Sequence, residues 1–267
     1  MRSIVLAFVL VSVGMSGEAF AQDTSIYLKK VFIRGNDSLP YRMLLPRDYD
    51  SSKKYPLVLF LHGSGERGND NIKQLTHGSQ LFLQGNIRRR FPAIVVFPQC
   101  PENDYWSNVK IVSDKKTKKQ SFEFQAGGAP TKVMDLTMDL EKNLLQTLPV
   151  DSSKVYVMGL SMGGMGTFEI VRRMPTVFAA AIPICGGADS STAKEIKKTA
   201  FWIFHGANDD VVPVKFSENM VSALQGFYTR ADMQYTVYSG IGHNSWDRAF
   251  AEPELLRWLF AQRREKL

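Results

Sequence analysis

The spacings typical of metal sites are missing from this sequence of 267 residues. It contains two cysteines, Cys100 and Cys185, and four histidines that lie far apart, so neither a CxxC nor an HExxH pattern occurs. We therefore expect chemistry that uses neither a metal nor another cofactor.

A hydrophobic run long enough to cross a membrane is also missing. The longest apolar stretch, Ile4 to Val13, is about half of the roughly 20 residues that a spanning helix needs. It follows Arg2 and precedes small residues that end in AFA at 19–21, which is the pattern of a secretory signal peptide. We predict that residues 1–21 are removed and that the protein is secreted or periplasmic, without membrane association; the alternative is an uncleaved anchor.

No arm of one charge sign stands out. Lysine and arginine number 33 against 26 aspartates and glutamates, but the net charge of +7 is scattered along the chain, so nucleic-acid binding is not predicted. A hydrophobic fraction of 44% supports a core of ordinary size and excludes a disordered chain. Neither an internal repeat nor a linker divides the sequence, so residues 22–267 are predicted to form one domain.

Short apolar runs alternate with helical patterns along the rest of the chain. Helical spacing occurs within 133–148, 165–174, 216–227 and 253–264. The apolar runs lie at 56–61, 93–97, 155–158, 178–184, 201–204 and 235–238, and the first three are almost continuously apolar, as buried parallel strands are. This alternation predicts an α/β fold whose mainly parallel sheet is covered by helices on both faces.

Two segments depart from the alternation. Residues 26–33 and 41–45, joined by the turn-forming sequence GNDS, predict an antiparallel hairpin at the N-terminus. Residues 107–129 are rich in lysine and predict an exposed insertion, either a solvated loop or a flap over the substrate.

The strand order usual for such a fold also bears on the two cysteines. The strands before Cys100 and Cys185 flank two others, so their ends should lie three spacings of about 4.8 Å apart. A disulfide tolerates Cα separations of about 7 Å at most. We expect both thiols to stay unpaired.

A GxSxG motif centred on Ser161 lies between a predicted strand and a predicted helix. Such a turn needs small residues at Gly159 and Gly163, because side chains there would collide with neighbouring backbone. It also points the serine hydroxyl out of the sheet and leaves backbone N–H groups free at the helix start. The context favours a nucleophilic serine over a plain glycine-rich turn.

The histidines narrow the choice of a general base. On such a fold the order along the chain is serine, acid, histidine. His62 and His77 precede Ser161, and His205 ends a strand with too little chain before it to supply the acid. His243, in a loop after the strand at 235–238, is the candidate base.

The acid should follow the strand between the serine and the base. Asp209 and Asp210 both lie there, and adjacent loop side chains diverge, so only one can face His243. The pattern alone does not choose between them.

A second glycine-rich loop follows the strand at 56–61. In the sequence HGSG, Ser64 or Gly65 could offer a backbone N–H to an oxyanion beside the N–H of Met162. His62 is expected to shape this loop rather than to transfer protons.

Six motifs in this order resemble secreted bacterial α/β-hydrolases of the phospholipase/carboxylesterase group. They are LHGSGERG at 61–68, PQCP at 98–101, GLSMGGMGTFE at 159–169, PICGGAD at 183–189, FHGANDDVVP at 204–213 and GHNSWD at 242–247. Relatives in that group include feruloyl and acetyl-xylan esterases and polyhydroxybutyrate-depolymerase-like enzymes. The resemblance implies a serine carboxylesterase that acts on small-molecule or polysaccharide-linked esters.

The resemblance also assigns individual residues. The family pattern HGxxDxxVP places the acid on Asp209, and Trp106 and Trp246 are implied to lie near the acyl or alcohol pocket, with ordinary aromatic packing as the alternative. Ser64 stands where alanine is usual, and the lysine-rich insertion is local to this sequence.

Two other functions compete with ester hydrolysis. Prolyl oligopeptidases share the serine turn and the order of the triad, but no additional large domain that would gate peptides is expected here. A binding protein that kept the fold without the chemistry is the other alternative. The intact set of Ser161, Asp209 and His243 argues against it.

Overall fold

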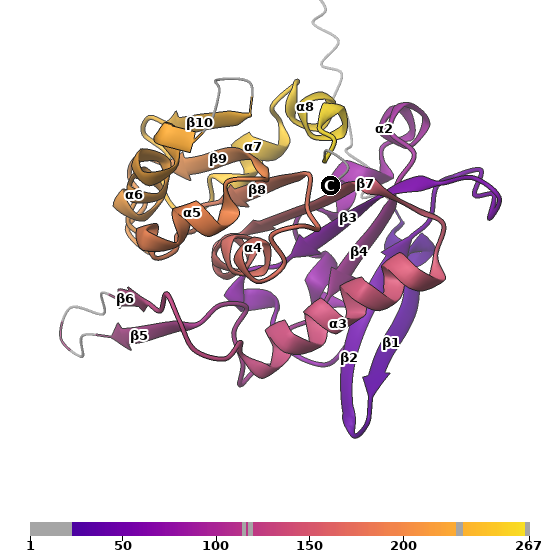
Figure 1. Cartoon of the computed structure of the whole chain (residues 1–267), viewed down its shortest axis with the longest axis horizontal. Coiled ribbons are helices and arrows are strands. Elements are labelled where there is room, and N and C mark those ends of the chain that lie inside the picture. Colours follow the sequence, from indigo (N-terminus) through magenta and orange to yellow (C-terminus); the bar gives the residue numbers. More distant parts are fainter. Residues whose placement is uncertain (1–22, 114–115, 117–119, 228–231, 265–267) are drawn as a thin grey trace, which may run out of the picture.

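The computed structural model describes residues 23–113, 116, 120–227 and 232–264, so the predicted signal peptide, residues 1–21, lies outside the described residues. Eight strands form the central sheet: β1 (Leu28–Arg34), β2 (Asp37–Leu44), β3 (Tyr55–Leu61), β4 (Ile94–Pro98), β7 (Val150–Leu160), β8 (Ala180–Ile184), β9 (Ala200–Gly206) and β10 (Met233–Tyr238). Their order across the sheet is β1-β2-β4-β3-β7-β8-β9-β10 (Figure 1).

The sheet is parallel except at its N-terminal end. Strands β4, β3, β7, β8, β9 and β10 pair in parallel, whereas β1 pairs antiparallel with β2, and β2 with β4. The predicted α/β architecture, a mostly parallel sheet with an antiparallel hairpin at the N-terminus, is confirmed.

Helices cover both faces, because alternate side chains of each strand point to opposite sides and both sets are apolar. In β3, Leu57, Leu59 and Leu61 join the core on one face, and Val58 and Phe60 join the core on the other. The first core includes side chains of α3 (Lys132–Thr147), α4 (Met162–Arg173), α5 (Ala193–Ile196) and α6 (Lys215–Leu224). The second includes side chains of α1 (Ser79–Leu83), α2 (Gly85–Arg90), α7 (Trp246–Phe250) and α8 (Leu255–Ala261).

Short 3-10 helices occur in the connections: η1 (Thr24–Ile26), η2 (Ser64–Glu66), η3 (Lys73–Leu75), η4 (Ser190–Thr192) and η5 (Gln225–Phe227). None of the helices in the described ranges is both long enough and apolar enough to cross a membrane.

The lysine-rich insertion contains a hairpin instead of an irregular loop. Strands β5 (Val109–Ser113) and β6 (Gln120–Phe124) pair antiparallel and project beside the main body (Figure 1). Val109, Ile111, Phe122 and Phe124 alternate along the two strands and form an apolar cluster with Met165, Val212 and Phe216. The positions between these apolar side chains include Lys110 and Glu123, so the sequence pattern was dominated by charge and the period of two was not noticed.

Candidate active site

The GxSxG turn joins β7 to α4 and brings Ser161 to the carboxyl ends of the parallel strands, the edge where α/β sheets place their sites. Ser161 has φ 53° and ψ −118°, a strained conformation for a residue with a side chain. A Cβ atom at Gly163 would overlap the carbonyl oxygen of Leu61, and one at Gly159 would overlap that of Gly163. The close approach of three backbone segments therefore explains both glycines of the motif.

A continuous chain of hydrogen bonds connects the three candidate catalytic side chains. His243 Nε2 lies 2.9 Å from Ser161 Oγ, and His243 Nδ1 lies 2.8 Å from Asp209 Oδ2. These residues are far apart in sequence and meet because Ser161 follows β7, Asp209 follows β9 and His243 follows β10. The arrangement lets one imidazole accept a proton from the serine while the carboxylate fixes its other nitrogen.

The surroundings of Asp209 hold it as a carboxylate. Its Oδ1 accepts hydrogen bonds from the backbone N–H groups of Val211, at 2.9 Å, and Val212, at 2.8 Å. Burial alone would raise the pKa of Asp209, but hydrogen bonds from His205, His243 and Val212 outweigh it and lower the pKa below its usual value. Asp210, by contrast, is exposed.

His205 is a partner of Asp209 that sequence reasoning set aside. The ring is fully buried, and its Nε2 lies 2.8 Å from the carbonyl oxygen of Val212 and 3.2 Å from Asp209 Oδ2. Because both neighbours are acceptors, this nitrogen carries the ring proton and donates it. His205 Nδ1 is 2.7 Å from Ser217 Oγ, so both ring nitrogens have partners and the ring orientation is fixed. The family pattern HGxxDxxVP contained this histidine, but only the fold shows which groups it contacts.

The two predicted oxyanion donors lie at the starts of two helices. Met162 is the first residue of α4, and Ser64 is the first residue of η2. Neither backbone N–H donates to an acceptor within the described ranges of the chain. A Cβ atom at Gly63 would lie 2.9 Å from Leu160 Cδ1, which shows how closely this loop approaches the strand that precedes Ser161. The geometry leaves both donors available to a ligand oxygen.

His62 and Trp106 hold this glycine-rich loop in place through buried hydrogen bonds. Burial lowers the pKa of His62 to about 4, so the ring is neutral. His62 Nε2 accepts the backbone N–H of Cys100 at 2.9 Å, while Nδ1 lies 2.6 Å from the carbonyl oxygen of Gly63. The loop-shaping role expected for His62 agrees with these contacts.

Trp106 differs from the expectation of a residue at the substrate pocket. It is fully buried, its Nε1 donates to the carbonyl oxygen of His62 at 3.0 Å, and it packs closely against Gly166. The indole offers no surface to a ligand in this structure, so the packing alternative describes it.

Trp246 lies beside the candidate base. Its ring is half-buried and meets the ring of His243 edge-on, with centroids 5.5 Å apart, and the ring of His77 at 5.2 Å. An aromatic side chain in this position can contact whatever group lies next to His243.

The Cys185 thiol is also close to the triad. The Sγ atom of Cys185, a carboxylate oxygen of Asp209 and a ring nitrogen of His243 lie within 4.8 Å of one another, a spacing that a metal ion could bridge. Burial raises the pKa of Cys185, and the charge of Asp209 adds to the effect, so the thiol stays protonated. Since metals bind thiolates and the other two groups already bond to each other, this set fits a triad beside a buried cysteine better than a metal centre.

Both cysteines are free and buried in the structure. Cys100 follows β4 and Cys185 follows β8, and the strand order places β3 and β7 between them. The expectation of unpaired thiols rested on these two intervening strands, because a disulfide cannot span the distance between the ends of β4 and β8.

Known proteins resemble this chain in sequence and fold. The model of the phospholipase/carboxylesterase family matches residues 49–253. A probable feruloyl esterase C from Aspergillus terreus (strain NIH 2624 / FGSC A1156) is 27% identical over 178 residues, which cover 65% of this chain but only 56% of that protein. This chain therefore spans little more than half the length of the curated relative.

Solved structures extend the comparison. A thermostable esterase is 35% identical, with a TM-score of 0.78 over 90% of this chain and 64% of its own. A mutant feruloyl esterase module from Clostridium thermocellum, complexed with sinapinate, has a TM-score of 0.62 at 16% identity and covers 90% of this chain and 89% of that one, a likeness of fold alone. Because the family model covers most of the residues that carry the fold and the triad, this chain belongs to the phospholipase/carboxylesterase family of α/β-hydrolases.

Proposed function

We propose that this protein is a serine carboxylesterase that hydrolyses carboxylic esters through an acyl-serine intermediate. The observation that carries the proposal is the hydrogen-bonded chain from Asp209 through His243 to Ser161, with distances of 2.8 and 2.9 Å. Ser161 supplies the nucleophilic hydroxyl, His243 the base, and Asp209 the carboxylate that orients the imidazole.

In the proposed reaction, Ser161 Oγ attacks the ester carbonyl carbon while His243 Nε2 accepts the serine proton. Asp209 holds the proton on Nδ1 and stabilises the imidazolium that forms. The backbone N–H groups of Met162 and Ser64 donate to the carbonyl oxygen as it becomes negatively charged. His243 then gives its proton to the leaving alcohol, and a water molecule attacks the acyl-serine in a second, similar step that releases the acid.

The substrate class we propose is an aromatic acyl ester, such as a feruloyl group attached to a polysaccharide. Two features support it: the similarity to a probable feruloyl esterase, and aromatic side chains near the triad. Trp246 meets His243, and Phe124 on β6 belongs to the same cluster as Met165, one turn after Ser161 on α4.

The nucleophile is tested by Ser161→Ala. The substitution removes the attacking atom and one small group, so kcat on an aryl acetate should fall about 10⁴-fold or more, with the thermal midpoint nearly unchanged. A variant that keeps more than about a tenth of the wild-type rate would refute the assignment, since the remaining machinery cannot form an acyl-serine.

The acid offers a matched pair of variants. In Asp209→Asn, the amide nitrogen can face His243 Nδ1, which forces the ring proton onto Nε2 and prevents that atom from taking the serine proton. We expect a loss of about 10³- to 10⁴-fold in kcat. Asp210→Asn makes the same chemical change on an exposed neighbour and should cost less than about threefold, within the usual range of surface substitutions.

A substrate panel tests the reaction class. Aryl acetate, aryl butyrate, methyl ferulate and a prolyl-peptide amide should be compared by kcat/KM with wild-type protein and Ser161→Ala. The proposal expects the ferulate to exceed the acetate and both to exceed the peptide. Faster cleavage of the peptide would favour the peptidase alternative, and no turnover of any of them would favour a binding protein.

We also propose that the protein is exported. The apolar stretch at 4–13 followed by AFA at 19–21 supports this proposal. N-terminal sequencing of the protein from the medium or periplasm should begin at Gln22, and an intact Met1 on membrane-bound protein would favour an uncleaved anchor.

A further inference from the structure

The edge of the sheet opposite the candidate triad is rich in positive charge. In a parallel α/β sheet, the residues that directly precede the strands meet at the amino edge, whereas the residues that follow them meet at the carboxyl edge. Lys53 and Lys54 precede β3, Arg90 precedes β4, and Lys197 and Lys198 precede β9. Charges that are scattered along the chain thus meet on one side of the molecule. We call this side the basic edge.

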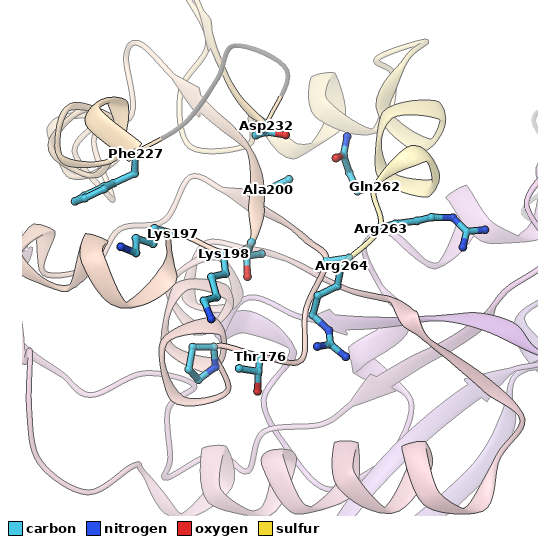
Figure 2. A pocket seen from close by; sticks show the side chains of 12 residues that line it. Thr176, Lys197, Lys198, Ala200, Phe227, Asp232, Gln262, Arg263 and Arg264 are labelled. Atoms are coloured by element: carbon cyan, nitrogen blue, oxygen red, sulfur yellow. The ribbon is translucent and has the colours of Figure 1, made fainter. Parts of the chain in front are cut away.

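One pocket of the basic edge, of about 320 Å³, lies at the starts of β8 and β9. Its cationic side chains are Lys197, Lys198, Arg263 and Arg264, and Asp232 is the acid among the described lining residues. Figure 2 shows Lys198 and Arg264 on either side of Thr176, with Arg263 pointing away from them.

The second pocket, of about 500 Å³, lies at the start of β3 and the segment before β4, beside Lys154 of β7. It is lined by five cations, Lys53, Lys54, Arg90, Lys154 and Arg257, and by no aspartate or glutamate among the described residues. Three of the five have an acid close by outside the pocket: Lys53 Nζ is 3.4 Å from Asp50, Arg257 is 3.3 Å from Glu254, and the charge of Lys154 acts on Asp151. These acids offset part of the charge, and five cations beside three carboxylates leave the pocket with a net positive charge.

The two pockets are adjacent. Phe260 and Ala261 line the second pocket, and the next three residues, Gln262, Arg263 and Arg264, line the first. One short segment after α8 therefore separates them, and an extended ligand could contact both. Together the two pockets present nine lysine and arginine side chains, with Asp232 in their described lining and Asp50, Asp151 and Glu254 beside it.

We propose that the basic edge binds a carboxylate-bearing polysaccharide, a polymer of uronic acids or a chain that carries them as side groups. Lysine and arginine bind carboxylates through charge-assisted hydrogen bonds, and closely spaced cations favour a ligand with repeated anionic groups. The proposal rests on the proposed function: a polymer held at the amino edge would keep its ester groups close to the carboxyl edge of the same molecule.

The same residues argue against the two other common polyanions. Single-stranded nucleic acids bind to aromatic faces on which successive bases stack. Here the Arg90 guanidinium lies 5.2 Å from the Phe91 ring centroid, Phe91 stacks on Phe260 at 5.0 Å, and Lys197 lies 5.6 Å from the ring of Phe227. Phe91 and Phe260 are thus paired with each other, and Phe227, 45% exposed, is the one exposed phenylalanine ring among the described lining residues, too few to stack successive bases. A flat anionic bilayer, in turn, makes poor contact with side chains that line concave pockets.

The proposal is tested with the Ser161→Ala protein, which removes turnover, in native gels containing polygalacturonate or neutral arabinoxylan. Retardation by polygalacturonate that weakens with salt is expected, with none by arabinoxylan. Two double variants, Lys197→Gln with Lys198→Gln and Lys53→Gln with Lys54→Gln, should each weaken the apparent affinity about fivefold, and their combination about 25-fold. All four side chains are exposed.

The matched control is Lys29→Gln with Lys30→Gln, two exposed lysines on β1 that lie in neither pocket. It changes the net charge by the same amount and should bind like the unmodified protein. An equal loss in this control means that total charge, not the basic edge, drives retention, and the proposal is then wrong. It is equally wrong if the Ser161→Ala protein is not retarded, or if phosphatidylglycerol vesicles or single-stranded poly-dT bind more tightly than polygalacturonate.

Hydrolysis of an aryl acetate separates this inference from the proposed function. Each lysine double variant, made in the wild-type background, should cleave the small ester at the wild-type rate. Cleavage without retention by polygalacturonate rejects the basic edge and leaves the esterase proposal standing. Retention without cleavage rejects the esterase proposal, and with it the link between the polymer and the triad.

Discussion

Glu141 is a buried acid whose titration should make the free energy of unfolding of this protein depend on pH. It lies on α3, is fully buried, and neither of its carboxyl oxygens has a hydrogen-bond partner in the described structure. Burial raises the pKa of Glu141 from 4.5 to about 8, so the folded protein holds this carboxyl group in its neutral form at pH 7.

The sign of the resulting pH dependence follows from proton linkage. Between pH 4.5 and about 8 the unfolded chain has lost this proton while the folded chain keeps it. The free energy of unfolding therefore falls as pH rises through this window and levels off above it. The contribution of Glu141 is complete below pH 4.5, and the total loss is at most about 5 kcal/mol, at about 1.4 kcal/mol per pH unit.

Glu141→Gln removes the titration and keeps the shape of the side chain. Urea unfolding of wild-type and variant proteins at pH 5 and pH 9, at the same ionic strength, isolates the effect of this one group. We expect the two proteins to differ by less than about 1 kcal/mol at pH 5, and the variant to be more stable by several kcal/mol at pH 9. Exposed Glu102 supplies the control, and Glu102→Gln should change little at either pH.

The reasoning is refuted if the difference in unfolding free energy between wild type and Glu141→Gln is the same at both pH values. Such a result would mean that the folded protein accommodates a charged Glu141.

Three further predictions concern the candidate site. His205→Leu removes a hydrogen-bond donor to Asp209, so kcat should fall about 10- to 100-fold with little change in KM; a change in KM alone would exclude a positioning role through the triad. Thiol titration of the denatured, unreduced protein should count two free thiols, from Cys100 and Cys185, and none in a monomer would show that they pair. Trp246→Ala should raise KM for methyl ferulate at least about threefold more than for an aryl acetate, since only the larger acyl group gains aromatic contact, and equal effects would place Trp246 outside the acyl pocket.

Much of the fold could be predicted because buried strands have a strong sequence signature. The run at 56–61 is apolar at every position since its side chains enter both cores, and it lies within β3. The predicted ends of the strands and helices were less accurate. Strand β7 begins at Val150 instead of Val155, because the polar residues between them do not look like a strand, and α6 ends at Leu224 with a 3-10 turn after it.

The side chains of the candidate triad could be named in advance because each lies at a fixed place relative to a predictable strand. The choice between Asp209 and Asp210 depended on family resemblance, since the direction of adjacent loop side chains is not visible in the pattern. His205 was excluded as the base by its place in the chain, and its position beside Asp209 could not be predicted, because its contacts with Val212 and Ser217 exist only after β9, the following loop and α6 pack together. Sequence spacing gave no signal for these contacts.

The clustering of positive charge could not be predicted from the sequence either. A net charge of +7 spread along 267 residues gives no patch in the sequence, yet the lysines and arginines before β3, β4 and β9 become neighbours because parallel strands all start at one edge. The topology that gathers the ends of β7, β9 and β10 around Ser161 necessarily gathers the starts of those strands on the opposite side. A site at one edge of such a sheet therefore leaves the other edge free to take on a separate binding role without disturbing the geometry of the triad.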